Sequence, residues 1–492
     1  MKDKFNNENI SSNSGMKAID FFMLGFGSMI GVGWTVSLND WFYTSGGVLG
    51  TILAFLIGTI MVIPIGLCYG EMTGALPVSG GAMAFAYRAE GSKLSFLGGW
   101  LTALAYIVLL PWELIYINHI LGILFPILTT GTPLYTIFGF NVYFGQLMTG
   151  IMLTIIMVYF NLKGAEISGK LQTRLTITIL ITAIIIIAFA LFKADFSNLT
   201  PIYKTVEGEN HSSFFGGFIS MLVIVPFFMA GFDAIPQAVE DAGDEIPPKQ
   251  ISKIIVFTIA AAGLFYTIIV LSSASAIPWD TFANLDSPAL AFMFNRIYEN
   301  PIGTFLYYLT LIGALAGLLS TYNGMFIAAT RLLFSMGRSH LIPEAFSKKS
   351  KSDAPIVAII FCGLATLIGP IFGTSVITPL TNVGSLSFVL GWLITCYSTL
   401  TLRKNEKELH RPMKAGEGRF IIKLSIFISA ILAILSLIPS SPGFMSYESL
   451  IIFIVWLVLG VIFYVISEHT GENITEDERF DLMFQGLDEE NS

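Results

Sequence analysis

Two acidic residues stand inside long apolar runs of the sequence. Asp233 lies in the segment FFMAGFDAIPQ, and Glu113 lies in VLLPWELIY. Ionisable side chains within membrane spans are costly and usually face a cavity, so each carboxylate is a candidate to pair with a substrate ammonium or to carry a proton. For Asp233 the alternative is a helix-end role, in which it accepts hydrogen bonds from freed backbone N–H groups. For Glu113 the alternative is a place near the outer surface.

The stretch GFGSMIGVG, residues Gly25–Gly33, puts four glycines into the first long apolar segment. Glycine lowers helix stability and lets a ligand approach the backbone closely. Unpaired backbone groups are expensive in hydrocarbon, so a broken helix survives only where it lines a cavity inside the protein. The stretch predicts a break near Ser28–Gly31, whose free N–H groups would hold a substrate carboxylate. Close packing of two helices through Gly27 and Gly31 is the alternative.

The sixth apolar segment carries a second set of helix breakers, Pro226, Gly231 and Pro236. Proline removes a backbone donor and clashes with the preceding turn, so we expect non-helical backbone near Met229–Ala234. Carbonyl groups freed there would receive a substrate ammonium. The first and sixth segments hold the same place in two consecutive sets of five, and paired interruptions of this kind indicate the binding site of a secondary transporter.

The composition places the chain in a membrane. Of its 492 residues 54% are hydrophobic and 12% are charged, and the mean hydropathy is +0.74. The apolar residues form runs of roughly 17–25 residues, the length that crosses a hydrocarbon core. The sequence has no hydrolase, nucleotide-binding or Cys/His metal motif, so we expect neither an enzyme nor a cofactor. Nothing in it indicates nucleic-acid binding.

The distribution of Lys and Arg supports a count of twelve spans. With the N-terminus cytoplasmic, all 26 Lys and Arg residues except Lys193, Lys204 and Arg296 fall on the cytoplasmic side. We therefore predict a multi-pass protein of the plasma membrane with both termini cytoplasmic. The expected spans are 18–38, 48–70, 94–126, 144–161, 169–192, 214–240, 251–274, 302–334, 355–373, 380–402, 420–438 and 447–467.

These spans predict four parts of the chain. A cytoplasmic tail, 1–17, precedes a ten-helix transport core, 18–402. The segment 403–467 holds a cytoplasmic loop and the last two spans, and an acidic cytoplasmic tail follows at 468–492. We expect this last tail to be solvated, and binding of a partner is the alternative.

Four motifs, taken in order, resemble those of the amino acid–polyamine–organocation (APC) superfamily. Gly27–Gly33 is similar to its first-helix glycine motif, and GEMTGALPVSGG is similar to its acidic residue followed by P-x-x-G-G. GFDAIPQAVEDAGDEIPP resembles the sixth-helix pattern, and STYNGMFIAATRLLFSMGR resembles the eighth helix. The resemblance covers about residues 15–470. Met29 and Trp34 depart from the pattern and would narrow the pocket or add an aromatic wall.

The resemblance implies an all-α integral membrane fold with twelve transmembrane helices. Ten would form a five-plus-five inverted repeat of the leucine-transporter type with broken helices one and six, and two C-terminal helices would follow. It implies a secondary active transporter that moves an amino acid or related amine by alternating access, as an ion-coupled symporter or an exchanger. A transporter-like nutrient sensor and an amine or polyamine exchanger are the alternatives. The expected partners are the small-molecule substrate and the lipid bilayer; the oligomeric state stays open.

The resemblance also assigns candidate site residues. The two breaks supply the substrate contacts, Ser28, Met29, Ile30, Gly31, Gly33, Met229, Gly231, Phe232 and Asp233. In sodium-coupled members an ion lies between helices one and eight, and the candidate ligands here are Gly27, Ile30, Gly317, Ser320 and Thr321. A proton is the other candidate coupling ion; some proton-coupled relatives carry a lysine in span five, and the middle of this span five has none. The gate candidates are Glu71, Arg88, Glu113 and Glu240.

Overall fold

A computed structural model describes residues 16–31, 33–163, 165–206, 211–243, 246–470 and 474–484. The expected N-terminal tail therefore lies outside the described residues except for its last two positions. Val32 of the glycine-rich stretch and residues 471–473 and 485–492 of the acidic tail also lie outside them.

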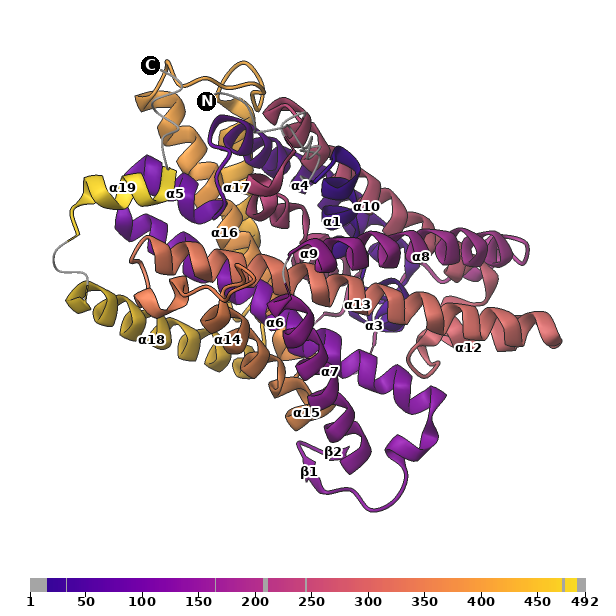
Figure 1. Ribbon diagram of the computed structural model, residues 1–492. Helices are drawn as coiled ribbons and strands as arrows, with labels where there is room; N and C mark the ends of the chain where they lie inside the picture. Colours follow the sequence, from indigo (N-terminus) through magenta and orange to yellow (C-terminus); the bar gives the residue numbers. More distant parts are fainter. Residues whose placement is uncertain are drawn as a thin grey trace, which may run out of the picture.

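Long helices make up most of the described chain (Figure 1). The glycine-rich stretch divides the first into α1 (Ala18–Met29) and α2 (Gly33–Val36). The others are α4 (Val48–Ala75), α6 (Ser92–Leu124), α7 (Phe144–Leu162), α8 (Ala165–Leu191), α9 (Phe214–Met229), α10 (Pro248–Ala276), α13 (Pro301–Arg338), α14 (Ile356–Thr366), α16 (Ile377–Asn405), α17 (Phe420–Leu437) and α18 (Tyr447–Thr470).

Short elements connect these helices. The α-helical ones are α3 (Leu38–Ser45), α5 (Ala82–Glu90), α11 (Trp279–Ala283), α12 (Ala289–Ile297), α15 (Ile368–Phe372) and α19 (Glu476–Phe484). The 3₁₀ turns are η1 (Pro126–Thr129), η2 (Phe196–Leu199), η3 (Phe232–Ala234), η4 (Pro236–Asp241), η5 (Glu344–Ser347) and η6 (Gly373–Val376). Strands β1 (Tyr135–Ile137) and β2 (Phe140–Val142) form one antiparallel hairpin, with Tyr135 opposite Val142.

Eleven helical stretches of the described chain are long and apolar enough to cross a membrane. Ten coincide with expected spans to within a few residues. The remaining one, Ile356–Asn405, is 50 residues long and contains the two expected spans 355–373 and 380–402. Within it α15 and η6 separate α14 from α16, and Gly373 has a φ of +60°, a conformation that favours glycine. The count of twelve crossings and the inverted repeat stay predictions.

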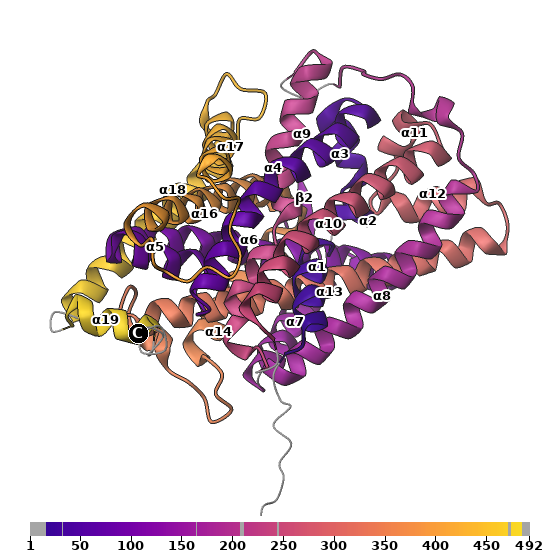
Figure 2. The ribbon, with the colours of Figure 1, turned by 90° about the horizontal axis from the view of Figure 1, so that it is seen from above.

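The helices differ in how much of their surface is buried. The stretch from α1 to α2, helix α6 and the stretch from α9 to η4 are mostly buried, whereas few residues of α7 and α18 are buried. The exposed side chains of α18 are apolar, as at Ile451, Val455 and Val461, which suits contact with lipid. Figure 2 shows α17 and α18 together at one side of the bundle. The two interrupted stretches therefore lie at the centre of the protein.

Helices α6 and α13 are unusually long, with 33 and 38 residues. At about 1.5 Å per residue, each exceeds a hydrocarbon core of about 30 Å. The sequence had indicated this excess for spans 94–126 and 302–334. Both helices contribute residues around the two interruptions, as described next.

Candidate functional site

The first interruption lies in the glycine-rich stretch but begins later than the predicted Ser28, because Ser28 and Met29 still belong to α1 and the Ile30 N–H donates to the Phe26 carbonyl. Helix α1 ends at Met29 and α2 begins at Gly33. A Cβ added at Gly31 would overlap the Thr321 hydroxyl and lie 2.8 Å from the carbonyl oxygen of Gly317, so α13 packs directly on the break. A break and close helix packing are thus both present, because glycine permits both.

The second interruption follows α9, which ends at Met229. Ala230 is extended, and Gly231 has a φ of +129°, which a residue with a side chain rarely adopts. The 3₁₀ turns η3 and η4 then replace regular helix, with Pro236 as the first residue of η4. Pro226 lies inside α9 and does not end it. The break predicted near Met229–Ala234 is confirmed.

The two interruptions touch each other. A Cβ at Gly231 would lie 2.8 Å from the backbone nitrogen of Met29. Two tyrosines fix the freed carbonyls. Tyr266 on α10 donates to the Met29 carbonyl at 2.6 Å, and Tyr106 on α6 donates to the Asp233 carbonyl at 2.9 Å. The irregular backbone is therefore held by neighbouring helices, as a membrane interior requires.

Asp233 lies at this meeting point, and only one of its two carboxylate oxygens accepts a hydrogen bond. It is 1% exposed, and its Oδ1 accepts a hydrogen bond from the Gly231 N–H at 3.0 Å. Its Oδ2 is buried and has no hydrogen-bond partner within the described chain. The side chains of Tyr106 and Trp392 lie next to the carboxylate. The helix-end role is thus real for one oxygen, and the other lacks a hydrogen bond within the described chain.

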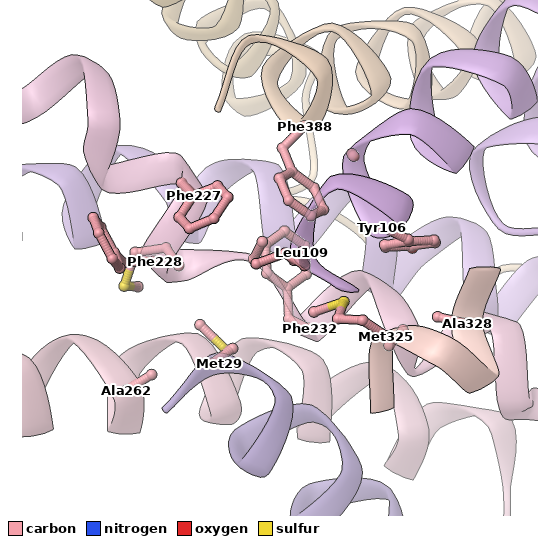
Figure 3. Close-up of a cluster of buried hydrophobic side chains, with 14 of the residues drawn as sticks. Met29, Tyr106, Leu109, Phe227, Phe228, Phe232, Ala262, Met325, Ala328 and Phe388 are labelled. Carbon is pink, nitrogen blue, oxygen red and sulfur yellow. The ribbon is translucent and has the colours of Figure 1, made fainter. Parts of the chain in front are cut away.

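Apolar side chains wall the meeting point (Figure 3). Phe232 is fully buried between Tyr69 and Trp392, with ring centroids 5.4 and 5.3 Å away. Gly33 lies against Trp41 and Phe228. Figure 3 shows side chains of several helices converging here, namely Met29, Tyr106, Leu109, Phe227, Phe228, Phe232, Ala262, Met325, Ala328 and Phe388. Ser28, Ile30 and Met229 are also buried.

The candidate ion ligands form a hydrogen-bonded cluster between α1 and α13. The carbonyl of Gly27 accepts from the hydroxyls of Ser320 at 3.2 Å and Thr321 at 3.3 Å, and Thr321 also donates to the Ser28 carbonyl at 3.1 Å. Gly317 packs against Gly31. The Ile30 amide donates to the Phe26 carbonyl within α1, and no described hydrogen bond joins Ile30 to this cluster.

The sequence interpretation missed Gln172 of α8, which completes this cluster. Its Nε2 donates to the Ser320 oxygen at 2.9 Å, and its Oε1 accepts from Asn323 at 3.1 Å. The Gln172 amide takes one lone pair of the Ser320 oxygen and the hydroxyl protons of Ser320 and Thr321 serve carbonyls, so the cluster is satisfied without an ion. Sodium binding here stays a prediction. The available signal was the pair of polar residues Gln172 and Thr176, one turn apart in an apolar span.

Comparison with known proteins agrees with this architecture. The family described as amino acid permease matches residues 20–476. The chain belongs to the amino acid permease family. The branched-chain amino acid permease BcaP of Bacillus subtilis is 25% identical over 93% of this chain and 94% of its own length. The methylthioribose transporter of Bacillus subtilis is 24% identical over 91% of this chain and 92% of its own length. The aspartate-proton symporter of Bacillus subtilis is 24% identical over 84% of this chain and 78% of its own length.

Members of this family are transporters, so the chain is a permease and not an enzyme. Its gate candidates lie in different places. Glu240 in η4 accepts from the Ser79 N–H at 2.8 Å and lies 3.7 Å from Arg338. Its neighbour Asp241 pairs with Arg331 of α13. A cavity of about 300 Å³ adjoins these charges, lined by Ser79, Asn161, Glu240, Asp241, Thr330 and Arg331 among others.

Glu71 and Arg88 do not join the Glu240 group. Glu71 is buried and pairs with Arg403 and Arg411, which anchors the loop after α16 to α4. Arg88 of α5 pairs with Glu406 at 2.9 Å, just beyond the end of α16. These ion pairs hold connecting segments of the permease in place.

Glu113 lies within α6 and is fully buried. Both of its carboxylate oxygens lack hydrogen-bond partners among the residues described. Its burial places Glu113 inside the permease and away from the surface.

Proposed function

We propose that this permease is a secondary active transporter that moves an amino acid across the plasma membrane by alternating access. One observation carries the proposal. The two interruptions meet at a buried carboxylate, Asp233, that keeps one unpaired oxygen. An unpaired buried charge is expensive, and a substrate ammonium would satisfy it.

The same geometry orients the rest of the substrate. The ammonium group would bind Asp233 Oδ2, and the substrate carboxylate would bind backbone N–H groups at the first break beyond Ile30, whose own N–H is bonded within α1. Its side chain would then face the apolar wall formed by residues such as Met29, Phe228 and Phe232. An apolar wall favours an apolar substrate side chain, because a polar one would lose hydrogen bonds there.

The unpaired oxygens also favour a proton over sodium in coupling. Asp233 and Glu113 each present buried carboxylate oxygens without partners among the described residues, and a carboxylate in such a place can take up and release a proton. The cluster around Ser320 is satisfied by the Gln172 amide without a cation. Ion-coupled symport and exchange both remain consistent with this arrangement.

Uptake into proteoliposomes tests the proposal. Purified permease would be reconstituted and offered radiolabelled amino acids with apolar, polar and charged side chains, with and without the same unlabelled amino acid inside. We expect saturable uptake of apolar amino acids that is accelerated by internal substrate, as for a carrier. Absence of uptake and of counterflow for every amino acid would overturn the proposal.

A further inference from the structure

The last described helix, α19, contacts the short helix α5 through Tyr87, whose ring centroid lies 6.4 Å from those of Phe480 and Phe484 (Figure 1). Phe480, Met483 and Phe484 recur at spacings of three and four, so they share one face of α19. Met483 and Phe484 are only 3% and 2% exposed. The start of the helix is fixed by a capping box, in which the Thr475 N–H donates to Glu478 Oε2 at 2.9 Å and Glu478 N–H donates to Thr475 Oγ1 at 3.2 Å.

This docking corrects the expectation of a wholly solvated acidic tail. The charge of residues 468–492 dominated the sequence interpretation. The few apolar residues of α19 did not outweigh that charge in a composition argument. Three of them, Phe480, Met483 and Phe484, lie on one face, and this is enough for a short amphipathic helix to pack on another helix. The acidic residues Asp477 and Asp481 are exposed, as a solvated face requires.

Tyr87 and Arg88 of α5 make the polar and cationic contacts with α19. The Tyr87 hydroxyl donates to Glu476 Oε2 at 2.5 Å and to the Glu476 carbonyl at 2.9 Å. Burial and the Glu476 carboxylate raise the pKa of Tyr87, so its phenol stays protonated and remains a donor. The guanidinium of Arg88 stands over the rings of Phe480 and Phe484, 4.8 and 5.8 Å from their centroids.

The segment just before α5 is bonded to the continuation of the second interruption. The Ser79 N–H donates to Glu240 at 2.8 Å, the Ser79 hydroxyl donates to the Gln237 carbonyl at 3.1 Å, and the Gly80 N–H donates to the Gln237 side chain at 3.1 Å. Gln237 and Glu240 belong to η4, which follows Asp233 directly. A continuous series of contacts thus runs from α19 through α5 to the candidate site.

Helix α19 does not block the cytoplasmic cavity. The cavity beside Ser79, Glu240 and Arg331 has no α19 residue among those that line it. Helix α19 acts from outside this cavity, on the segment that holds η4. Ser79 and Gly80 lead directly into α5, so a movement of α5 would act on their bonds to η4, and α5 is bound to α19 through Tyr87 and Arg88.

We propose that α19 is a latch on α5 that slows opening of the cytoplasmic end of the permease. The proposal rests on the proposed function only in taking this opening as a step of transport. The docked latch stabilises the closed arrangement of α5 and η4, so its release lowers the barrier to opening. It does not touch the Asp233 region, so the maximal rate should rise while KM stays near its original value.

The double variant Phe480→Ala/Phe484→Ala in the full chain tests the latch. Asp481→Ala, on the exposed face of the same helix, is the matched control. Hydrogen exchange would be measured by mass spectrometry on both proteins in lipid nanodiscs, followed by initial rates of uptake in proteoliposomes. We expect faster exchange in residues 474–484, 79–90 and 236–241 of the double variant alone, and a several-fold rise in maximal rate.

Three results would overturn the latch. The first is faster exchange in residues 474–484 while exchange in residues 79–90 and 236–241 stays as in wild type. The second is an unchanged maximal rate of uptake, and the third is a lower maximal rate. Because the exchange measurement needs no substrate, failure of the latch is distinguishable from failure of the proposed function. If the double variant does not fold, Tyr87→Phe removes the hydrogen bonds to Glu476 and keeps the aromatic packing. Tyr87→Phe should then speed hydrogen exchange and raise the maximal uptake rate, each by a smaller factor than expected for the double variant. Exchange at residues 236–241 equal to that of wild type would count against the latch.

Discussion

Glu71 and Asp233 are both buried carboxylates, but the protein satisfies them in opposite ways. Glu71 accepts two hydrogen bonds from Arg403, at 2.5 and 2.7 Å, and forms an ion pair with Arg411 at 3.1 Å. Asp233 accepts one hydrogen bond, from the Gly231 N–H, and its Oδ2 has no partner in the described part of the chain.

The difference shows that pairing, more than burial, separates an anchoring charge from a binding charge. A carboxylate enclosed by two arginines has no capacity left for a ligand, and its removal leaves two buried cations uncompensated. A carboxylate with an unpaired oxygen costs free energy until something binds it. The predictions below test this contrast, from the largest expected effect to the smallest.

Gly31→Val should have the largest effect, because it alters the backbone on which the Asp233 site depends. The new side chain would overlap Thr321 and would meet the Gly317 carbonyl, which is backbone and cannot turn away. We expect substrate binding to be abolished, measured by isothermal titration or a scintillation proximity assay. Gly169→Ala is the control, since no heavy atom lies within 4 Å of the added Cβ, and it should bind as wild type does. Unchanged affinity in Gly31→Val would remove this break from the site.

Glu71→Gln should reduce stability strongly and leave substrate affinity near the wild-type value. Breaking a buried ion pair costs on the order of 3–5 kcal/mol, because the partner charge stays buried. Thermal unfolding in detergent would show a lowered midpoint relative to wild type. Glu408→Gln, at an exposed position in the same loop, should unfold as wild type does. If the Glu71→Gln protein had normal stability and weakened substrate binding, Glu71 would be a binding residue and not an anchoring one.

Asp233→Asn should act on transport rather than on folding, because the pairing that it removes is with a ligand. Loss of a charge-assisted hydrogen bond of about 1.5–3 kcal/mol corresponds to roughly a 10–100-fold rise in KM. Uptake across a range of external pH separates the two roles of this carboxylate. A raised KM at every pH indicates ammonium binding, whereas retained binding without the pH dependence indicates proton transfer. Wild-type uptake at every pH would leave Asp233 as a helix cap only.

Replacing sodium by choline should leave the initial rate of uptake unchanged. The Ser320 oxygen already accepts from Gln172, so the cluster requires no cation. The measurement is uptake into proteoliposomes under imposed sodium or proton gradients, with equal gradients of potassium as the control. Uptake driven by a sodium gradient would contradict this prediction, because it would show that the cluster around Gln172 and Ser320 rearranges to bind sodium.

Much of the architecture followed from local sequence properties. Apolar run length located the helices, and the Gly and Pro positions located both interruptions, because these residues act on their own backbone. The eleven stretches match the expected spans closely, with two spans joined in Ile356–Asn405. Asp233 was also found from its surroundings alone, since an acid in an apolar run needs little further context.

The partners of each charged group could not be predicted in the same way. Glu71 and Arg403 are 332 positions apart, and only the packing of α4 on α16 brings them together. Gln172 resembles any polar residue near a helix end until α13 is placed beside it. Pairing across such distances is a property of tertiary structure, so Glu71 could be predicted only as a gate candidate, without its two arginine partners.

Direct substrate binding by three proteins tests the contrast most simply. Wild type, Glu71→Gln and Asp233→Asn would be titrated in the same nanodiscs with the amino acid that wild type transports. The account predicts the same Kd for wild type and Glu71→Gln, and a Kd about 10–100-fold higher for Asp233→Asn. Equal binding by wild type and Asp233→Asn, with binding lost in a folded Glu71→Gln protein, would contradict it.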